Sequence, residues 1–218
     1  MHLSIHDSIY EKWPDTTLGV ITATVLCHPE NPELKNELNE LSAHYQSQLQ
    51  IEDIAKLKSI ADTRSAYKAF GKEPSRYRVS SEALLRRILQ GKGLYYINTI
   101  VDTGNLVSIY SQFGVCCFDQ EKIVGDIQFC IANEGETYQG IGKGILNISN
   151  LPVFKDSQGS FGSPTSDSDR TKITLDTQQL LFCIVSFSGR NNLEHLLQYA
   201  LSRLEKYCNA TDVSVQII

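Results

Sequence analysis

The sequence predicts an α+β fold, with a mixed or antiparallel sheet, packed helices and an N-terminal helical appendage. Apolar residues before Gly91 recur mainly at helical spacing, whereas the pattern from Phe113 onward is mainly β. Elements that are partly segregated along a chain in this way are typical of α+β proteins. With 218 residues, 41% hydrophobic and 21% charged, the chain is long and apolar enough to bury a core.

The N-terminal part contains one predicted strand and two predicted helices. Residues 18–26 alternate and are rich in β-branched side chains, which favours a strand. Asn31 and Pro32 are a typical cap and first-turn proline, and the apolar spacing continues as a helix to Leu49. A second helix is predicted over residues 54–70, ending at Gly71.

A basic, extended connection over residues 74–79 then leads to another helix. Ser80 or Ser81 caps this helix, and Gly91 ends it. The change of pattern suggests a division into two parts, an N-terminal strand and helical appendage packed on the main fold (1–72) and the main α+β domain (73–218).

The second half contains five predicted strands and a last helix. Asn191 is expected to cap this helix, with Glu194 placed as the third residue of a capping box. The strands are expected near residues 113–118, 126–132, 151–156, 171–176 and 180–187.

A polar stripe is predicted within residues 97–107. If this segment is helical, Asn98, Asp102 and Asn105 fall on one side of it. Such a stripe could bind a sugar hydroxyl or a ligand ammonium group. Alternatively, Asn98 caps the helix and Asp102 holds a neighbouring loop, because buried polar groups need partners.

The stretch from Phe161 to Arg170 is the most polar of the chain and is predicted to be an ordered loop, since its side chains compete for backbone hydrogen bonds. It is either a solvated turn or a binding loop. As a site for ester hydrolysis, its amides would supply oxyanion donors, Asp167 or Asp169 would orient water, and Arg170 would hold a phosphate or carboxylate.

The densest basic region of the chain includes Arg76, Arg78 and Arg87 and is interleaved with tyrosine. It is either a track for an RNA backbone or an ordinary solvated helix face. The net charge of −5 argues against broad adhesion to nucleic acid but allows a local basic groove. RNA is therefore a possible partner, whereas DNA is not expected.

No cofactor, metal or membrane partner is expected. The cysteines form no Cys-x-x-Cys pair and have no histidine at metal-ligand spacing, so free thiols in a reducing, cytoplasmic location are predicted. No stretch approaches the length of a membrane span, and residues 1–14 do not resemble a signal peptide. The cysteines are Cys27, Cys116, Cys117, Cys130, Cys183 and Cys208.

Several short motifs resemble the tRNA-binding and editing domain of the phenylalanyl-tRNA synthetase beta subunit. They are Asn98-x-x-x-Asp102-x-x-Asn105, Phe118-Asp119 with Lys122-Ile123, and further stretches similar to stand-alone relatives of that domain, namely residues 134–138, 140–144, 151–154 and the polar loop. The resemblance covers about residues 75–187. It implies an α+β domain with a pocket near the polar loop, which receives the tRNA acceptor end and an amino-acid moiety.

The chain departs from this family where the synthetase domain has a histidine and a glutamate. Cys116 stands at the histidine position, and Pro164 and Thr165 follow Gly162-Ser163 where the glutamate is expected. Two hypotheses follow, a free-standing deacylase of mischarged tRNA and a non-catalytic module that recognises tRNA, an amino acid or another small ligand. Neither would aminoacylate tRNA by itself.

The predicted site residues form three groups. The catalytic candidates are Asp167, Asp169 and Thr165; the substrate-binding candidates are Asn98, Asp102, Asn105, Gly162, Ser163, Ser166 and Arg170; and the RNA-binding candidates are Arg76, Arg78 and Arg87.

Overall fold

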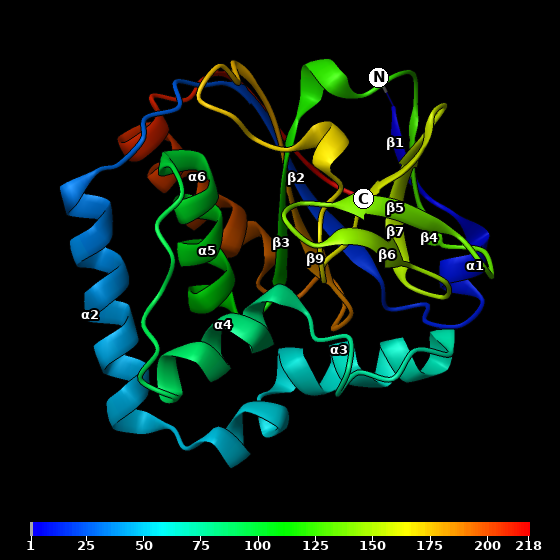
Figure 1. The fold of residues 1–218 in the computed structure, drawn as a ribbon, viewed down its shortest axis with the longest axis horizontal. Coiled ribbons are helices and arrows are strands. Elements are labelled where there is room, and N and C mark those ends of the chain that lie inside the picture. The colour runs from blue at the N-terminus through cyan, green and yellow to red at the C-terminus, as the bar shows by residue number, and fades with distance from the viewer. Residues whose placement is uncertain (1) are drawn as a thin grey trace.

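The computed structural model describes residues 2–218 and confirms the α+β fold (Figure 1). The α-helices are α1 (Asp7–Tyr10), α2 (Pro32–Gln48), α3 (Lys58–Phe70), α4 (Ser80–Leu89), α5 (Thr99–Ser111) and α6 (Leu193–Cys208). The 3-10 helices are η1 (Ile51–Lys56), η2 (Gln120–Lys122) and η3 (Asp169–Thr171). The strands are β1 (Leu3–Ile5), β2 (Thr17–Thr24), β3 (Gly114–Asp119), β4 (Ile127–Ile131), β5 (Thr137–Gly140), β6 (Gly144–Asn147), β7 (Pro152–Asp156), β8 (Gly159–Gly162), β9 (Gln179–Ser186) and β10 (Thr211–Ile217).

The strands form two four-stranded sheets and a hairpin. The first sheet has the order β10-β2-β9-β3 and is antiparallel throughout. The second has the order β1-β4-β7-β8, with β1 parallel to β4, and β5 and β6 form the hairpin. Within residues 2–218, no helix is long and apolar enough to cross a membrane.

The alternation of side chains along β9 explains why the first sheet has a hydrophobic core on each of its faces. Leu181, Cys183 and Val185 point into a core shared with the second sheet, which also holds Phe129 and Phe154. Leu180, Phe182 and Ile184 point to the opposite face, where they pack in a core shared with α5 and α6. A strand that is buried on both faces reads as a continuous apolar run, as this one does.

Several predicted elements are confirmed. The strand, the helix capped by Asn31 and the helix ended by Gly71 correspond to β2, α2 and α3. Asn31 Oδ1 accepts the backbone amides of Glu33 and Leu34 at 2.9 and 3.1 Å, as a cap does. The first two strands of segment 1–72 are hydrogen-bonded into the two sheets, and the division of the chain at residue 72 stays a prediction.

The predicted strand at 171–176 is wrong. This segment begins in η3 and continues as a turn, in which the Thr174 amide donates to Thr177 Oγ1 at 2.9 Å and the Thr177 amide donates to the Thr174 carbonyl at 3.2 Å. The threonine alternation that suggested a strand therefore closes a local turn instead. Sequence reasoning also missed β1, β5, β6, β8 and β10, which are short or polar.

Three helix starts differ from the expectations. The predicted helix over 54–70 is interrupted at Leu57, between η1 and α3. The first residue of α4 is Ser80, and its N-cap, Val79, makes no side-chain cap. Before α6, the N-cap residue Asn192 is left-handed (φ 65°) and makes no side-chain cap. The predicted capping box at Glu194 is thus absent, and its carboxylate pairs with Arg190 at 3.4 Å.

The polar loop is shorter than predicted because Phe161 and Gly162 belong to β8. A Cβ at Gly162 would overlap the ring of Phe118, so only glycine allows this strand to lie against the aromatic core. Residues 163–166 then form a tight turn, in which Ser163 and Ser166 exchange both backbone hydrogen bonds, at 2.9 and 3.2 Å.

Candidate functional site

A pocket of about 270 Å³ lies between α5, β3 and the end of the polar loop. It is the candidate functional site because it joins two residues predicted from different segments, Asn105 of α5 and Asp167 of the loop. Its walls are mostly apolar, which is typical of ligand pockets with a few polar groups. The remaining lining residues are Ser80, Ile97, Val101, Gly104, Val115, Cys117, Ile141, Lys172 and Ile173.

Asp167 is the most unusual group in this pocket. Its Oδ1 atom is buried and has no hydrogen-bond partner among residues 2–218. Burial raises the pKa of the Asp167 carboxyl to about 7, although the Ser163 amide and the Lys143 ammonium lower it in part. A buried acceptor without a partner costs free energy, so its presence calls for an explanation. A carboxyl group with this pKa exchanges a proton near neutral pH.

The backbone around Asp167 holds it in place. Its carbonyl accepts the Ile141 amide at 3.3 Å, and it forms an isolated β-bridge with Gly162. The neighbouring residue, Ser168, bridges to Gly140 of the hairpin. The polar loop is therefore fixed between β8 and the β5–β6 hairpin. These backbone contacts determine the position of Asp167.

The polar stripe of α5 divides between two roles. Asn98 is the N-cap, since its Oδ1 accepts the Val101 amide at 3.0 Å. Asp102 is buried and accepts a hydrogen bond from the Ile97 amide at 3.0 Å. It therefore holds the segment before α5, which is the second of the two predicted alternatives. Burial raises the pKa of the Asp102 carboxyl to about 6. Asn105 alone of the three lines the pocket.

The turn residues of the loop use their own polar groups. Ser163 Oγ accepts the amides of Thr165 and Ser166 at 3.2 and 3.0 Å. The Ser163 amide donates to the Ser166 carbonyl. These amides are therefore engaged inside the turn, and the expectation that amides of the loop bind an oxyanion stays a prediction. Thr165 Oγ1 lies 3.0 Å from the hydroxyl of Tyr67.

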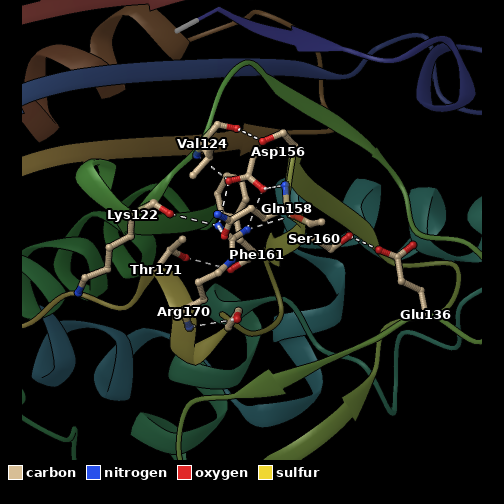
Figure 2. A network of polar contacts seen from close by, with 12 residues as sticks. Lys122, Val124, Glu136, Asp156, Gln158, Ser160, Phe161, Arg170 and Thr171 are labelled. Atoms are coloured by element: carbon tan, nitrogen blue, oxygen red, sulfur yellow. Dashed lines mark hydrogen bonds and ion pairs between the residues drawn. The ribbon is translucent and has the colours of Figure 1, made fainter.

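Arg170 does not line the pocket and lies in a polar network with Asp156 (Figure 2). Its guanidinium donates twice to Asp156, at 2.9 Å each, and also to the carbonyls of Lys122 and Gly159 at 3.1 and 3.2 Å. Burial opposes ionisation of Asp156, but the hydrogen bonds from Arg170 and from backbone amides hold its pKa below the usual range. Arg170 is thus occupied by the fold, and its predicted contact with a ligand phosphate stays a prediction.

Asp169 also lies outside the pocket. It is half-exposed and pairs with Lys172 at 2.9 Å. The two acidic residues of the loop therefore differ, because Asp167 belongs to the pocket lining and has a buried Oδ1, whereas Asp169 forms a surface ion pair.

The sequence reasoning predicted free thiols but did not place one of them in the pocket. Alternation along β3 places Val115 and Cys117 on the pocket face, whereas Cys116 is buried in the core between the two sheets. A Cβ at Gly104 would lie 2.7 Å from Cys117 Sγ, so this glycine gives the sulfur room. Burial raises the pKa of the Cys117 thiol well above its usual value, which keeps it neutral. The period-two pattern of β3 was the available sign of this face.

The predicted basic residues lie together. Arg76, Arg78 and Arg87 line one open depression of about 350 Å³ with Ala83, Arg86, Gln90 and Lys92. Beneath it, the fully buried carboxylate of Glu82 accepts Arg64 at 3.0 Å and Arg86 at 2.9 Å. Arg78 lies 3.8 Å from the same carboxylate. One anion thus pairs with several cations, and the depression keeps a positive excess that can bind phosphates.

Arg76 also lines a second depression, of about 400 Å³, on the side of the β5–β6 hairpin. Thr165 and Ser166 of the polar loop face this depression together with Lys143. The basic depression and the polar loop are therefore linked by Arg76. No group of three His, Cys, Asp or Glu side chains that could hold a metal ion occurs in the described part of the chain.

Comparisons with known proteins place the chain in a family. The B3/4 domain family matches residues 62–216, from within α3 to β10. No curated protein matches the chain. Among solved structures, an N-terminal fragment of the phenylalanyl-tRNA synthetase beta subunit from Pyrococcus horikoshii is similar, with 13% identity and a TM-score of 0.45. The match covers 99% of this chain and 50% of that fragment, so the chain spans about half of the fragment's length.

The family match covers more than half of the chain and contains every lining residue of the pocket. It agrees with the family that the motifs around Asn105 and Phe118 resemble. The chain belongs to the B3/4 domain family and is a domain related to phenylalanyl-tRNA synthetase.

Proposed function

We propose that this chain binds aminoacyl-tRNA and hydrolyses the ester bond of a mischarged aminoacyl group in the Asp167 pocket. The observation that carries the proposal is the Asp167 carboxyl group, which belongs to the lining of a pocket of about 270 Å³ and whose buried Oδ1 has no partner among residues 2–218. A pocket of this size has room for an amino-acid moiety. The mostly apolar walls suit its side chain, and the carboxyl group suits a donor such as water or an ammonium.

In this mechanism Asp167 is the general base. Its carboxylate takes a proton from a water molecule as the water oxygen attacks the ester carbonyl carbon. The Asn105 amide lies in the same lining and donates to the oxyanion that develops. The intermediate then collapses with cleavage of the bond to the ribose oxygen, which receives the proton from Asp167. The products are a free amino acid and a tRNA with a free terminal hydroxyl.

The basic depression supplies the tRNA contact in this proposal. Phosphates of the acceptor end would lie against Arg76, Arg78 and Arg87. Exchanging Arg76→Glu with Arg87→Glu should weaken tRNA binding at least tenfold, with a weaker salt dependence. Lys12→Glu with Arg190→Glu changes the net charge equally at exposed positions away from the depression and should leave binding within about twofold.

Hydrolysis is tested with a panel of mischarged tRNAs, headed by tyrosyl-tRNA for phenylalanine. The parent protein should deacylate at least one member, and Asp167→Asn should lower the rate by about a hundredfold or more. Asp176→Asn is the matched control, since it removes an exposed carboxylate close to the loop that does not belong to the pocket lining. Equal rates for the two variants would contradict the role of Asp167.

A second function, recognition without chemistry, is favoured by one observation. The loop amides that would serve as oxyanion donors are engaged in the turn at residues 163–166. For this function, tRNA or an amino acid should bind with no deacylation above the uncatalysed rate. Asp167→Asn should then weaken binding of the amino-acid moiety rather than turnover.

A further inference from the structure

The segment between α4 and α5 exposes three consecutive large apolar side chains. Tyr95 is 66% exposed, Tyr96 is 36% exposed and Ile97 is 58% exposed. Adjacent exposed apolar side chains are typical of interaction surfaces. Tyr96 is held within the fold, because its hydroxyl donates to Asn39 Oδ1 at 2.8 Å. The exposure of Tyr95 has no such explanation.

One face of the Tyr95 ring is covered by Arg87. The guanidinium carbon lies 3.8 Å from the ring centroid, a close cation–π stack. Although one face is covered, Tyr95 remains the most exposed residue of this segment's three apolar side chains. An arginine stacked behind an exposed tyrosine stiffens the ring, which lowers the entropy lost when a planar ligand stacks on it.

The segment connects the two sites already described. Arg87 and Lys92 line the basic depression, and Ile97 lines the Asp167 pocket. Tyr95 lies between them in sequence, on the segment that runs from the end of α4 to the start of α5 (Figure 1). A strand that has its phosphates in the depression and its end in the pocket would pass this segment.

The segment is fixed at both ends although it has no regular secondary structure. Arg87 Nη2 donates to the Lys92 carbonyl at 3.1 Å, and the Ile97 amide donates to Asp102 Oδ1 at 3.0 Å. Asn98 then caps α5. Tyr95 is thus presented on a loop that the fold holds in place, which favours a preformed binding surface.

We propose that Tyr95, backed by Arg87, is a stacking platform for an unpaired base near the 3′ end of a bound RNA. This inference rests on the proposed function and adds to it that the bound RNA is single-stranded where it passes Tyr95. Exposed aromatic rings beside cationic grooves bind single strands in this way, because every base has a flat face. Inside an RNA duplex the bases already stack on one another, so their faces are not free to contact this ring.

The test compares two RNA hairpins, one with an unpaired 3′ extension and one with a blunt end. The parent protein should bind the extended hairpin more tightly. Tyr95→Ala should weaken binding of the extended hairpin by about tenfold and leave the blunt hairpin unchanged, whereas Tyr95→Trp should retain the preference. Tyr10→Ala is the matched control, since Tyr10 is 38% exposed on α1 and lines neither site.

A second readout follows the stack directly. An extended hairpin that carries 2-aminopurine in its unpaired part should lose fluorescence on binding the parent protein and should keep it on binding Tyr95→Ala. Loss of affinity for both hairpins alike, or for neither, overturns the platform while tRNA binding stands. If the parent protein binds neither hairpin and no tRNA, the proposed function itself fails.

Discussion

Arg170 and Asp167 lie three residues apart in one loop, and the fold treats them in opposite ways. The Arg170 guanidinium has a full set of acceptors in Asp156 and two backbone carbonyls. The Asp167 carboxyl has a buried oxygen with no partner in the described residues. Both looked equally functional in a polar stretch. The comparison teaches that partners, rather than polarity, separate a charged group that the fold uses from a carboxyl group for which the described residues supply no partner.

Removal of Arg170 should give the largest loss of stability. Arg170→Ala leaves the Asp156 carboxylate buried without its cation, which should cost about 3 kcal/mol in the free energy of unfolding. Lys172→Ala breaks a half-exposed pair in the same loop and should cost less than about 1 kcal/mol. Urea denaturation at neutral pH measures both. Similar losses would remove the contrast between structural and surface charges.

The same ion pair predicts an acid limit. The pKa of Asp156 is depressed in the folded state. Its contribution to the free energy of unfolding is therefore complete above the unfolded pKa of about 3.9 and is lost as the pH falls through the folded pKa. In the Arg170→Ala variant this part of the pH dependence should be weaker.

Asp167→Asn should change stability in the opposite direction. Burial raises the pKa of Asp167 to about 7, so the folded state holds a proton that the unfolded chain releases above about pH 3.9. The stability of the parent protein should therefore fall as the pH rises from about 4 to about 7 and level off above that. The asparagine variant lacks this slope and should exceed the parent by up to about 4 kcal/mol at about pH 8, the free energy that corresponds to a pKa shift of about three units. Parallel curves for the two proteins would contradict a raised pKa.

Gly104→Ala narrows the pocket without touching the polar loop. The new Cβ would press on Cys117 Sγ at 2.7 Å and displace it into the pocket. We expect KM for the aminoacyl-tRNA substrate to rise about tenfold. The higher helix propensity of alanine offsets the steric strain, so the free energy of unfolding should stay within about 1 kcal/mol of the parent value. The double variant Gly104→Ala with Cys117→Ala should recover KM. Failure of this rescue would place the substrate elsewhere.

The smallest effect is expected at Asp102. Burial raises the pKa of this carboxyl group to about 6, but the group keeps a hydrogen-bond partner, the Ile97 amide. Asp102→Ala removes one hydrogen bond, worth about 1 kcal/mol, so amide exchange at Ile97 should quicken by about fivefold. Asp102→Asn retains an acceptor and should leave the exchange rate nearly unchanged. A faster exchange in the asparagine variant would show that the charge, rather than the hydrogen bond, holds the segment.

The sequence predicted the parts of this fold that have strong local patterns. The helix after Asn31 and the strand around Cys183 follow from capping and from a continuous apolar run. Residues 171–176 failed because threonines alternate in a turn as readily as in a strand. β10 was missed because it is an edge strand with mostly exposed side chains, which depends on pairing with β2.

The site was predictable only in part, for a physical reason. Asp167 and Asn105 were both named, but nothing local indicated that the two lie in one pocket, since α5 and the loop are distant in sequence. The pairing of Arg170 with Asp156 was also not predictable, because Asp156 belongs to β7 and not to the loop. Neither of the loop's own carboxylates, Asp167 and Asp169, pairs with Arg170. The family motif Phe118-Asp119 is structural here, with Phe118 in the aromatic core and Asp119 accepting from Thr177 at 3.1 Å. This explains why the motif identified the fold more securely than the chemistry.

The position of β2 in the middle of the first sheet has a consequence for how the chain folds. Its two neighbours, β9 and β10, come from the far end of the sequence. During synthesis β2 must therefore wait, with its backbone hydrogen-bonding groups unpaired, until β9 and β10 have been made. Sheets made of such distant pairs fold slowly, because a large loop must close before any contact forms. Refolding of this domain should be correspondingly slow and sensitive to protein concentration.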